Sequence, residues 1–469
     1  MTNIITRNTP KGIENGIANI PSAFNLIKFD ITNSKNEVRD IRRIIESFTI
    51  TEELFSPVIT LSATIKDTIN FFEDFGINGQ EIINVEIEKI SNNAEINAAT
   101  PVKNIKLKLA VLEYPNYEKL ASSPNIQKYS LIAISDFAYL SALTKISRSI
   151  KNNVLTNIYN IFKDDLNVKL LVPKKLPITM FDGIITIQSP LRAAEWLRSK
   201  LFDSVGSPFF LFNRISENIP RLSSWSELVN SSSYRKYTYK QKLNITGPSP
   251  EAYKDGILRI LEMQSNMKLN KLELAKAGAF ASVVNVTDLG NKTWTQQIFN
   301  ADKSQSVIVP NTLETLKVIQ DPFKAAFNKG SVTLYTPGKT SKPVALSDMP
   351  NASMTNLEVN TVQYPHSQLN STSGPLLSNI ANAKAFSARM SSVTHEVTVY
   401  GDLYLNPGRK IDLEIYKAIN VEIYDKSTTR NNIDQLDERI SGPYIISNVT
   451  HSFSDGYYTS KLRVVSDKL

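Results

Sequence analysis

The chain has 469 residues, with 53 Lys and Arg against 45 Asp and Glu, which gives a net charge of +8. At about 150 residues per domain this length predicts two or three domains, and the 41% of apolar residues excludes a disordered scaffold. Because the chain contains no cysteine, a disulfide framework, a thiolate nucleophile and a cysteine-ligated zinc site are excluded as well.

The sequence offers few candidate catalytic residues and predicts neither a signal peptide nor a membrane span. The only histidines are His366, His395 and His451, which leaves few places for a general base or a metal cluster. Residues 1–23 are polar and interrupted by Gly and Pro, so we expect no signal peptide, and no apolar run approaches the roughly 20 residues that span a bilayer. Lysines alternate with acidic residues along the chain, which disfavours nucleic-acid binding as the main role.

Residues 24–136 predict an antiparallel sheet or barrel. Apolar residues alternate with polar ones over 59–65, 83–87 and 105–111, a period of two that is typical of strands with one solvated face. One short helical turn is expected at 67–75.

The period changes in residues 137–206, which predict a mostly helical insertion. Ile150, Val154, Ile158 and Ile161 share one helical stripe, and Ser189-Pro190 marks the start of a second helix. The aromatic runs at 208–214 and 234–240 then predict short strands that return to complete the first sheet.

Residues 249–300 are mixed, and residues 301–384 are rich in Ser, Asn and Pro, which predicts an irregular, loop-rich insertion. A helix is expected at 376–392. Four strands should close the chain, separated by turn residues such as Asp455-Gly456. Their expected positions are 395–405, 409–417, 442–453 and 457–467.

The known catalytic and cofactor motifs fail on spacing. Gly338-Lys339-Thr340 resembles the end of a phosphate-binding loop, but Thr333 stands where that loop needs glycine. Gly12 and Gly16 have no strand before them, so a dinucleotide site is also disfavoured. His451 lies on an expected strand without a second histidine at ligand spacing, which favours a hydrogen-bonded histidine over a metal ligand.

Adjacent carboxylates do not indicate hydrolysis either. Glu52-Glu53, Glu73-Asp74 and Asp164-Asp165 are expected at solvated helix ends and turns, and no Gly-x-Ser-x-Gly nucleophile elbow occurs. The sequence therefore predicts no catalytic residue, no metal or cofactor site and no cofactor. It favours an assembly component over an enzyme.

Three segments resemble the baseplate hub protein of contractile-tailed bacteriophages, which is related to the hub and spike proteins of contractile injection systems. The most specific is 24–87, with SFTITEELFSP, KDTINF and GINGQE. The others are 189–214, with SPFFLF, and the closing strands within 399–417 and 441–467. These motifs mark the fold and include no catalytic residue, and 301–384 matches no pattern of that family.

The resemblance implies a β-rich α+β fold with two tail-tube-like antiparallel β-barrel domains, made discontinuous by one helical and one loop-rich insertion. The expected divisions are an N-terminal arm (1–21), a first barrel (22–136, completed by 207–248), a helical insertion (137–206), a second barrel (249–300, completed by 385–469) and a loop-rich insertion (301–384).

The implied function is that of a structural hub in the tail baseplate of the virion, assembled in the host cytoplasm. A homotrimer would form a ring of pseudo-sixfold symmetry that adapts a threefold central spike to the sixfold tail tube. Further expected partners are tube-initiator, tape-measure and baseplate wedge proteins, with DNA only as transient cargo of the channel. The alternatives are a tail-associated hydrolase and a receptor- or carbohydrate-binding tail protein.

Overall fold

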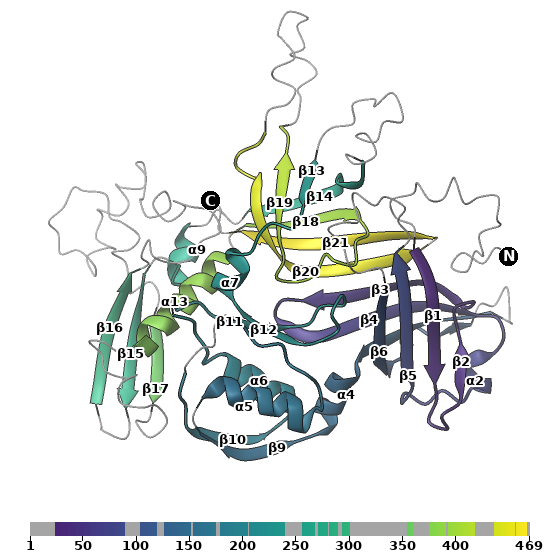
Figure 1. Cartoon of the computed structure of the whole chain (residues 1–469), viewed down its shortest axis with the longest axis horizontal. Helices are drawn as coiled ribbons and strands as arrows, with labels where there is room; N and C mark the ends of the chain where they lie inside the picture. The colour runs from purple at the N-terminus through teal and green to yellow at the C-terminus, as the bar shows by residue number, and fades with distance from the viewer. Residues whose placement is uncertain are drawn as a thin grey trace, which may run out of the picture.

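The computed structural model describes most of the chain and is β-rich, with short helices between the strands (Figure 1). The described residues are 24–89, 104–119, 126–151, 153–174, 179–204, 206–239, 256–267, 271–279, 281–288, 293–300, 354–359, 375–390, 393–417, 436–454 and 456–466.

A large sheet of 14 strands contains both ends of the described chain. Its N-terminal part, called here the N-terminal set, lies on the right of Figure 1 and is antiparallel throughout, as the alternating sequence predicts. The set consists of β1 (Phe24–Thr32), β2 (Val38–Asp40), β3 (Ile45–Glu53), β4 (Ser56–Asp67), β5 (Ile82–Lys89), β6 (Asn104–Glu113), β7 (Glu118–Lys119) and β8 (Gln127–Ser135). The expected helical turn is α2 (Phe71–Asp74).

The remaining strands of this sheet form the C-terminal set, in the upper part of Figure 1. All four closing strands predicted from the sequence are present. The set consists of β13 (Lys236–Tyr239), β14 (Ile260–Met267), β18 (Val393–Tyr400), β19 (Lys410–Ile415), β20 (Gly442–Ser454) and β21 (Tyr457–Ser466).

The helical segment lies beneath the sheet and has its own apolar core. Of the predicted stripe, Val154 and Ile158 lie on one helix and are fully buried, and Ile161 begins the π-helix that follows. Ile150 is a correction, because it ends the strand Ile146–Ile150, which pairs antiparallel with Gly183–Gln188 and places two strands in the segment predicted to be mostly helical. The helix expected after Ser189 is present, but the Ser189 side chain does not cap it; the Leu191 N–H instead donates to the Ser141 hydroxyl at 3.0 Å. The elements are α4 (Asp136–Leu143), β9 (Ile146–Ile150), α5 (Val154–Asn160), the π-helix η1 (Ile161–Asp165), β10 (Gly183–Gln188) and α6 (Pro190–Arg198).

The aromatic runs do not join the N-terminal set. The first pairs with a neighbouring strand in a separate two-stranded sheet, and β13 lies parallel to β19. The buried Asp402 carboxylate explains the second placement, since it accepts the Tyr234 hydroxyl and pairs with Arg235, both at 2.9 Å, just before β13. The expectation that 207–248 complete the first sheet is corrected accordingly, while the division into two domains stays a prediction. The separate sheet consists of β11 (Phe209–Phe212) and β12 (Arg221–Ser224), followed by α7 (Trp225–Val229).

A three-stranded sheet lies at the left of Figure 1, beside the predicted C-terminal helix. It belongs to the mixed region, and most of the expected loop-rich insertion (301–384) lies outside the described residues. The elements are α9 (Lys271–Lys276), β15 (Ala281–Asp288), β16 (Thr293–Asn300), β17 (Met354–Val359) and α13 (Pro375–Met390).

The two strand sets have the same internal order. When strands are numbered along the chain within each set, with β2 and β7 left out, the N-terminal set runs β3–β4–β8–β6–β5–β1 and the C-terminal set runs β14–β18–β21–β20–β19–β13. In both sets the strands therefore lie side by side in the order second, third, sixth, fifth, fourth, first. Only the first strand differs in direction, because β1 is antiparallel to β5 whereas β13 is parallel to β19.

Irregularities in pairing also coincide. Between the second and third strands, the register shifts at Ile45/Ser47 in one set and at Ile260/Glu262 in the other. A β-bulge is a specific local feature, so its presence at the same step of the same ladder is evidence that the sets are equivalent.

The ladder of the fifth and sixth strands shows the same agreement. The register shifts at Val111/Glu113 between β6 and β8, and at Ile446/Asn448 between β20 and β21. The two sets thus share their strand order and these two register shifts, whereas the further shift at Thr51/Glu53 between β3 and β4 has no counterpart between β14 and β18.

Candidate functional site

The N- and C-terminal sets meet along β20, which changes partner partway along its length. Residues 442–445 pair with β19, and residues 448–454 pair with β3. The register shift at Ile446/Asn448 lies between these stretches. One strand therefore belongs to both sets, and the polar side chains at this junction form the candidate site.

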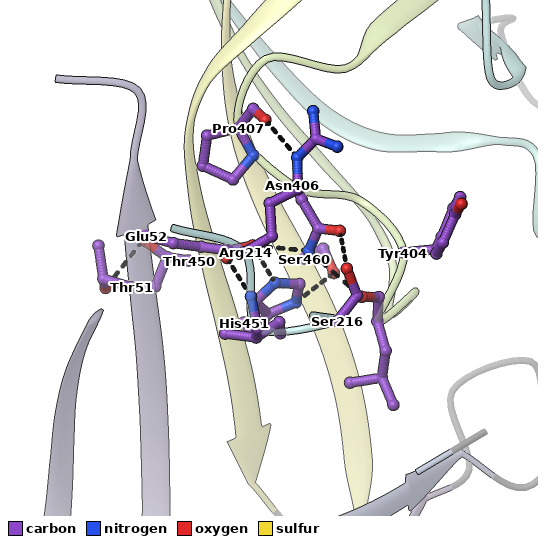
Figure 2. Close-up of polar contacts among 12 residues, drawn as sticks. Thr51, Glu52, Arg214, Ser216, Tyr404, Asn406, Pro407, Thr450, His451 and Ser460 are labelled. Atoms are coloured by element: carbon purple, nitrogen blue, oxygen red, sulfur yellow. Dashed lines mark hydrogen bonds and ion pairs between the residues drawn. The ribbon is translucent and has the colours of Figure 1, made fainter. Parts of the chain in front are cut away.

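Glu52 is the centre of a buried hydrogen-bond network at this junction (Figure 2). Its carboxylate accepts the Asn406 side-chain amide at 2.9 Å and the Ile215 backbone N–H at 2.7 Å, and it lies 3.3 Å from His451 Nε2. With 1% of its surface exposed, Glu52 is not the solvated residue that the sequence predicted. The buried carboxylate is stabilised because donors reach both of its oxygens.

The network ties a third segment to the two strand sets. Ser216 donates to the Asn406 side chain at 2.6 Å, and Arg214 Nε donates to the Pro407 carbonyl at 3.2 Å. Residues 214–216 follow β11, whereas 406–407 lie in the turn between β18 and β19. Segments about 160 to 190 positions apart are therefore fixed to one another.

His451 extends the network into the C-terminal set. Its Nε2 lies on the Glu52 carboxylate, while Nδ1 lies 2.7 Å from the Tyr458 hydroxyl and 3.2 Å from the Ser460 hydroxyl. The ring is fully buried, which confirms the predicted hydrogen-bonded histidine.

Arg214 places a positive charge beside this carboxylate. Burial lowers the pKa of Arg214 to about 10, and the nearby Arg221 and Arg409 act in the same direction, while Glu217 and Glu52 oppose them. The guanidinium therefore stays charged at neutral pH. A buried cation near a buried anion favours one fixed arrangement of the segments that carry them.

The other sequence candidates lie apart from this network. His395 on β18 is fully buried, with Nε2 2.9 Å from the Tyr444 hydroxyl, and burial lowers its pKa to about 4. Glu73 and Asp74 are exposed as predicted. His366, Gly12, Gly16 and the segment Gly338-Lys339-Thr340 lie outside the described residues.

A pocket of about 740 Å³ opens beside the junction. In it the Ser226 hydroxyl donates to the Asp203 carboxylate, but no histidine lines the pocket, so these two residues do not form a hydrolytic triad. Within the described ranges, no three His, Asp or Glu side chains gather as a metal site would need. The charged lining residues are Lys174, Asp203, Arg214, Arg221, Glu227, Arg409 and Lys410.

Sequence reasoning missed Glu52, although a signal for it was present. Phe48 and Ile50 alternate on the inward face of β3, and Glu52 is the next residue of that face. A carboxylate at an inward position requires partners. Those partners, Ile215 and Asn406, come from distant segments that no local pattern identifies.

Fold and site together describe a β-rich chain in which a buried hydrogen-bond network joins two strand sets. The chain is similar in fold to the tail protein from Neisseria meningitidis MC58, with 11% sequence identity and a TM-score of 0.50 over 95% of this chain and 97% of that one. At this identity the likeness establishes the fold, and it confirms the expected resemblance to phage tail proteins at that level.

Two further solved structures are more distant. The 43 kDa tail protein of prophage MuSo2 from Shewanella oneidensis has 8% identity and a TM-score of 0.46, over 94% of this chain and 97% of that one. A type VI secretion system component of Escherichia coli has 8% identity and a TM-score of 0.41, over 94% of this chain and 76% of that one. No protein-family model and no curated protein matches the sequence.

Proposed function

We propose that the chain is the structural hub of a contractile phage tail baseplate. Three copies form a ring whose two strand sets per chain give pseudo-sixfold symmetry, so that a sixfold tail tube rests on one face and a threefold central spike on the other. The observation that carries the proposal is the strand order and register that occur twice in one chain. Such a repeat supplies the equivalent docking surfaces that a hexameric tube requires.

Each strand set is proposed to form a tube-like barrel. In the C-terminal set, a single bridge from Thr238 to Arg259 links the outer strands β13 and β14. In the N-terminal set, the Phe29 and Phe48 rings of β1 and β3 lie 5.7 Å apart within one core. Contacts between the first and second strands of each set support closure around that core.

The remaining partners follow from this position in the tail. Spike, tube-initiator, tape-measure and wedge proteins contact the ring, which belongs to the virion baseplate, and DNA only passes through its channel. None of the described helices has the length and hydropathy to cross a bilayer. The role is structural and non-enzymatic, because Glu52 and His451 are saturated by internal partners.

A cryo-EM map of the assembled tail tests the proposal. We expect three copies around the axis, with the two strand sets of each copy at similar radius and about 60° apart. Native mass spectrometry of the purified chain measures the same stoichiometry in solution. Six copies per ring, or two strand sets at different radii, would contradict the symmetry adaptor. Turnover of peptidoglycan by the purified chain would contradict the non-enzymatic role.

A further inference from the structure

The junction inside one chain provides a template for contact between chains. Within the chain, the second strand of the N-terminal set, β3, pairs with the part of β20 that extends beyond β19. β20 is the fifth strand of the C-terminal set. At this junction, the second strand of one set therefore pairs with the part of a fifth strand that extends beyond the fourth strand of the other set.

Among the described residues, the second strand of the C-terminal set does not pair with the fifth strand of the N-terminal set. The second strand of the C-terminal set is β14, which forms a ladder with β18 on one side only. Across the described residues its other side has only the bridge from Arg259, just before the strand. The side chains of Leu261, Glu262, Gln264 and Asn266 are exposed, as an edge strand would have them.

The fifth strand of the N-terminal set has a matching free part. β5 pairs with β6 up to Ala110, and the Val111 N–H then donates to the Glu81 carbonyl at 2.9 Å, as the Ile446 N–H does to Arg409 in the other set. Beyond that point, residues 112–119 pair with β8 but with no other described strand.

We infer that β14 of one copy pairs antiparallel with the 112–119 edge of a second copy. This inference rests on the proposed ring and specifies the surfaces that close it. A heterologous contact between copies then repeats the contact already made within each copy, and a rotation of about 60° at every such junction closes a ring of three copies. Among the residues that the structure describes, neither edge has a ladder partner on its outer side, and most residues of both edges are exposed, as an edge that awaits a partner strand would be.

The register follows from the equivalence of the two sets. Within the chain, Thr49 lies opposite Ser452. Ser47 is the first paired residue after the bulge in β3, and Glu262 is the first paired residue after the bulge in β14. Two residues further along each strand, Thr49 and Gln264 are therefore counterparts. The counterpart of Ser452 is Glu118, since Lys128 and Thr459 occupy equivalent places on the sixth strands. The inferred contact therefore sets Glu118 of one copy opposite Gln264 of the next.

Cysteine crosslinking tests this register, because the chain has no cysteine of its own. Residues directly opposite on antiparallel strands lie about 5 Å apart, within reach of a disulfide. The variant Glu118→Cys/Gln264→Cys, oxidised at high protein concentration, should give covalent dimers and trimers on a non-reducing gel. Thr49→Cys/Ser452→Cys is the positive control, which should lose its free thiols while remaining a monomer.

A matched negative control uses Glu118→Cys/Glu396→Cys. Glu396 lies opposite Gln264 on β18, the strand behind β14 as seen from the inferred contact. A cysteine at 396 would therefore lie about 10 Å from the cysteine at 118 of the other copy, too far for a disulfide. Crosslinking of the test pair well above this control supports the inference. A threefold ring in the cryo-EM map together with crosslinking no greater than the control would overturn the inference and leave the proposed function intact. Absence of a threefold ring would instead overturn the proposed function.

Discussion

Glu52 shows how one buried carboxylate joins distant parts of a chain. Its donors come from the segment after β11 and from the turn between β18 and β19, and His451 contacts it from β20. Removing the carboxylate leaves these donors buried and unpaired, which costs more free energy than the bonds themselves contribute. The residue therefore matters for stability well beyond its own packing.

Replacing Glu52 by Gln should lower the free energy of unfolding by about 2 kcal/mol, because an amide offers one oxygen to donors that now reach two. Glu53→Gln is the matched control. Glu53 is exposed and bonds only the exposed Asn448 amide at 2.9 Å, so its change should be within about 0.5 kcal/mol. Urea unfolding measures both variants, and equal midpoints would contradict the role of Glu52.

His395 should make stability depend on pH. Burial lowers its pKa to about 4, whereas the unfolded chain takes up the proton near pH 6.5. The unfolded state therefore binds more protons as the pH falls from 6.5 to 4, and the free energy of unfolding drops by up to about 1.4 kcal/mol per pH unit. Above pH 6.5 the group has no effect.

The variant His395→Phe should show a flatter decline in stability over this pH range in urea unfolding. Tyr444→Phe is the control, because it removes the hydroxyl beside the ring but keeps the titrating imidazole. An unchanged slope in His395→Phe would show that other groups cause the decline.

At the scale of elements, local patterns predicted most strands and helices. The alternation in 59–65 and the helical stripe from Val154 to Ile158 depend only on which face is buried, so they can be read from sequence. The change of partner along β20 and the placement of β13 beside β19 depend on residues more than 150 positions away. Local periodicity carries no information on such pairing.

Gly401, directly after β18, should resist substitution for a steric reason. A Cβ at this position would overlap the Tyr458 ring, which is fully buried and bonds His451. Gly401→Ala should therefore lower the free energy of unfolding by about 1–3 kcal/mol. Gly256→Ala is the control, since no atom lies within 4 Å of the added Cβ. Thermal unfolding measures both, and equal effects would contradict the steric argument.

At the scale of the whole molecule, the inferred contact between copies should respond to charge. Glu118 and Gln264 lie directly opposite each other in the inferred register, and both are exposed. Gln264→Glu alone places two carboxylates opposite each other and should weaken association about twofold to fivefold at low salt. The double variant Glu118→Lys/Gln264→Glu should restore it. Sedimentation velocity measures the effect, and a double variant as weak as the single variant would contradict the register.

The β3–β20 ladder also affects the kinetics of assembly. Because it joins two strand sets within one covalent chain, the proposed ring forms from three bodies in two intermolecular encounters, whereas separate copies of each set would be six bodies and need five. The second set is always present at the high effective concentration that a covalent link provides. The concentration of the proposed ring then varies with the third power of chain concentration, so a ring of two-set chains can form at a lower concentration than a ring of six separate sets.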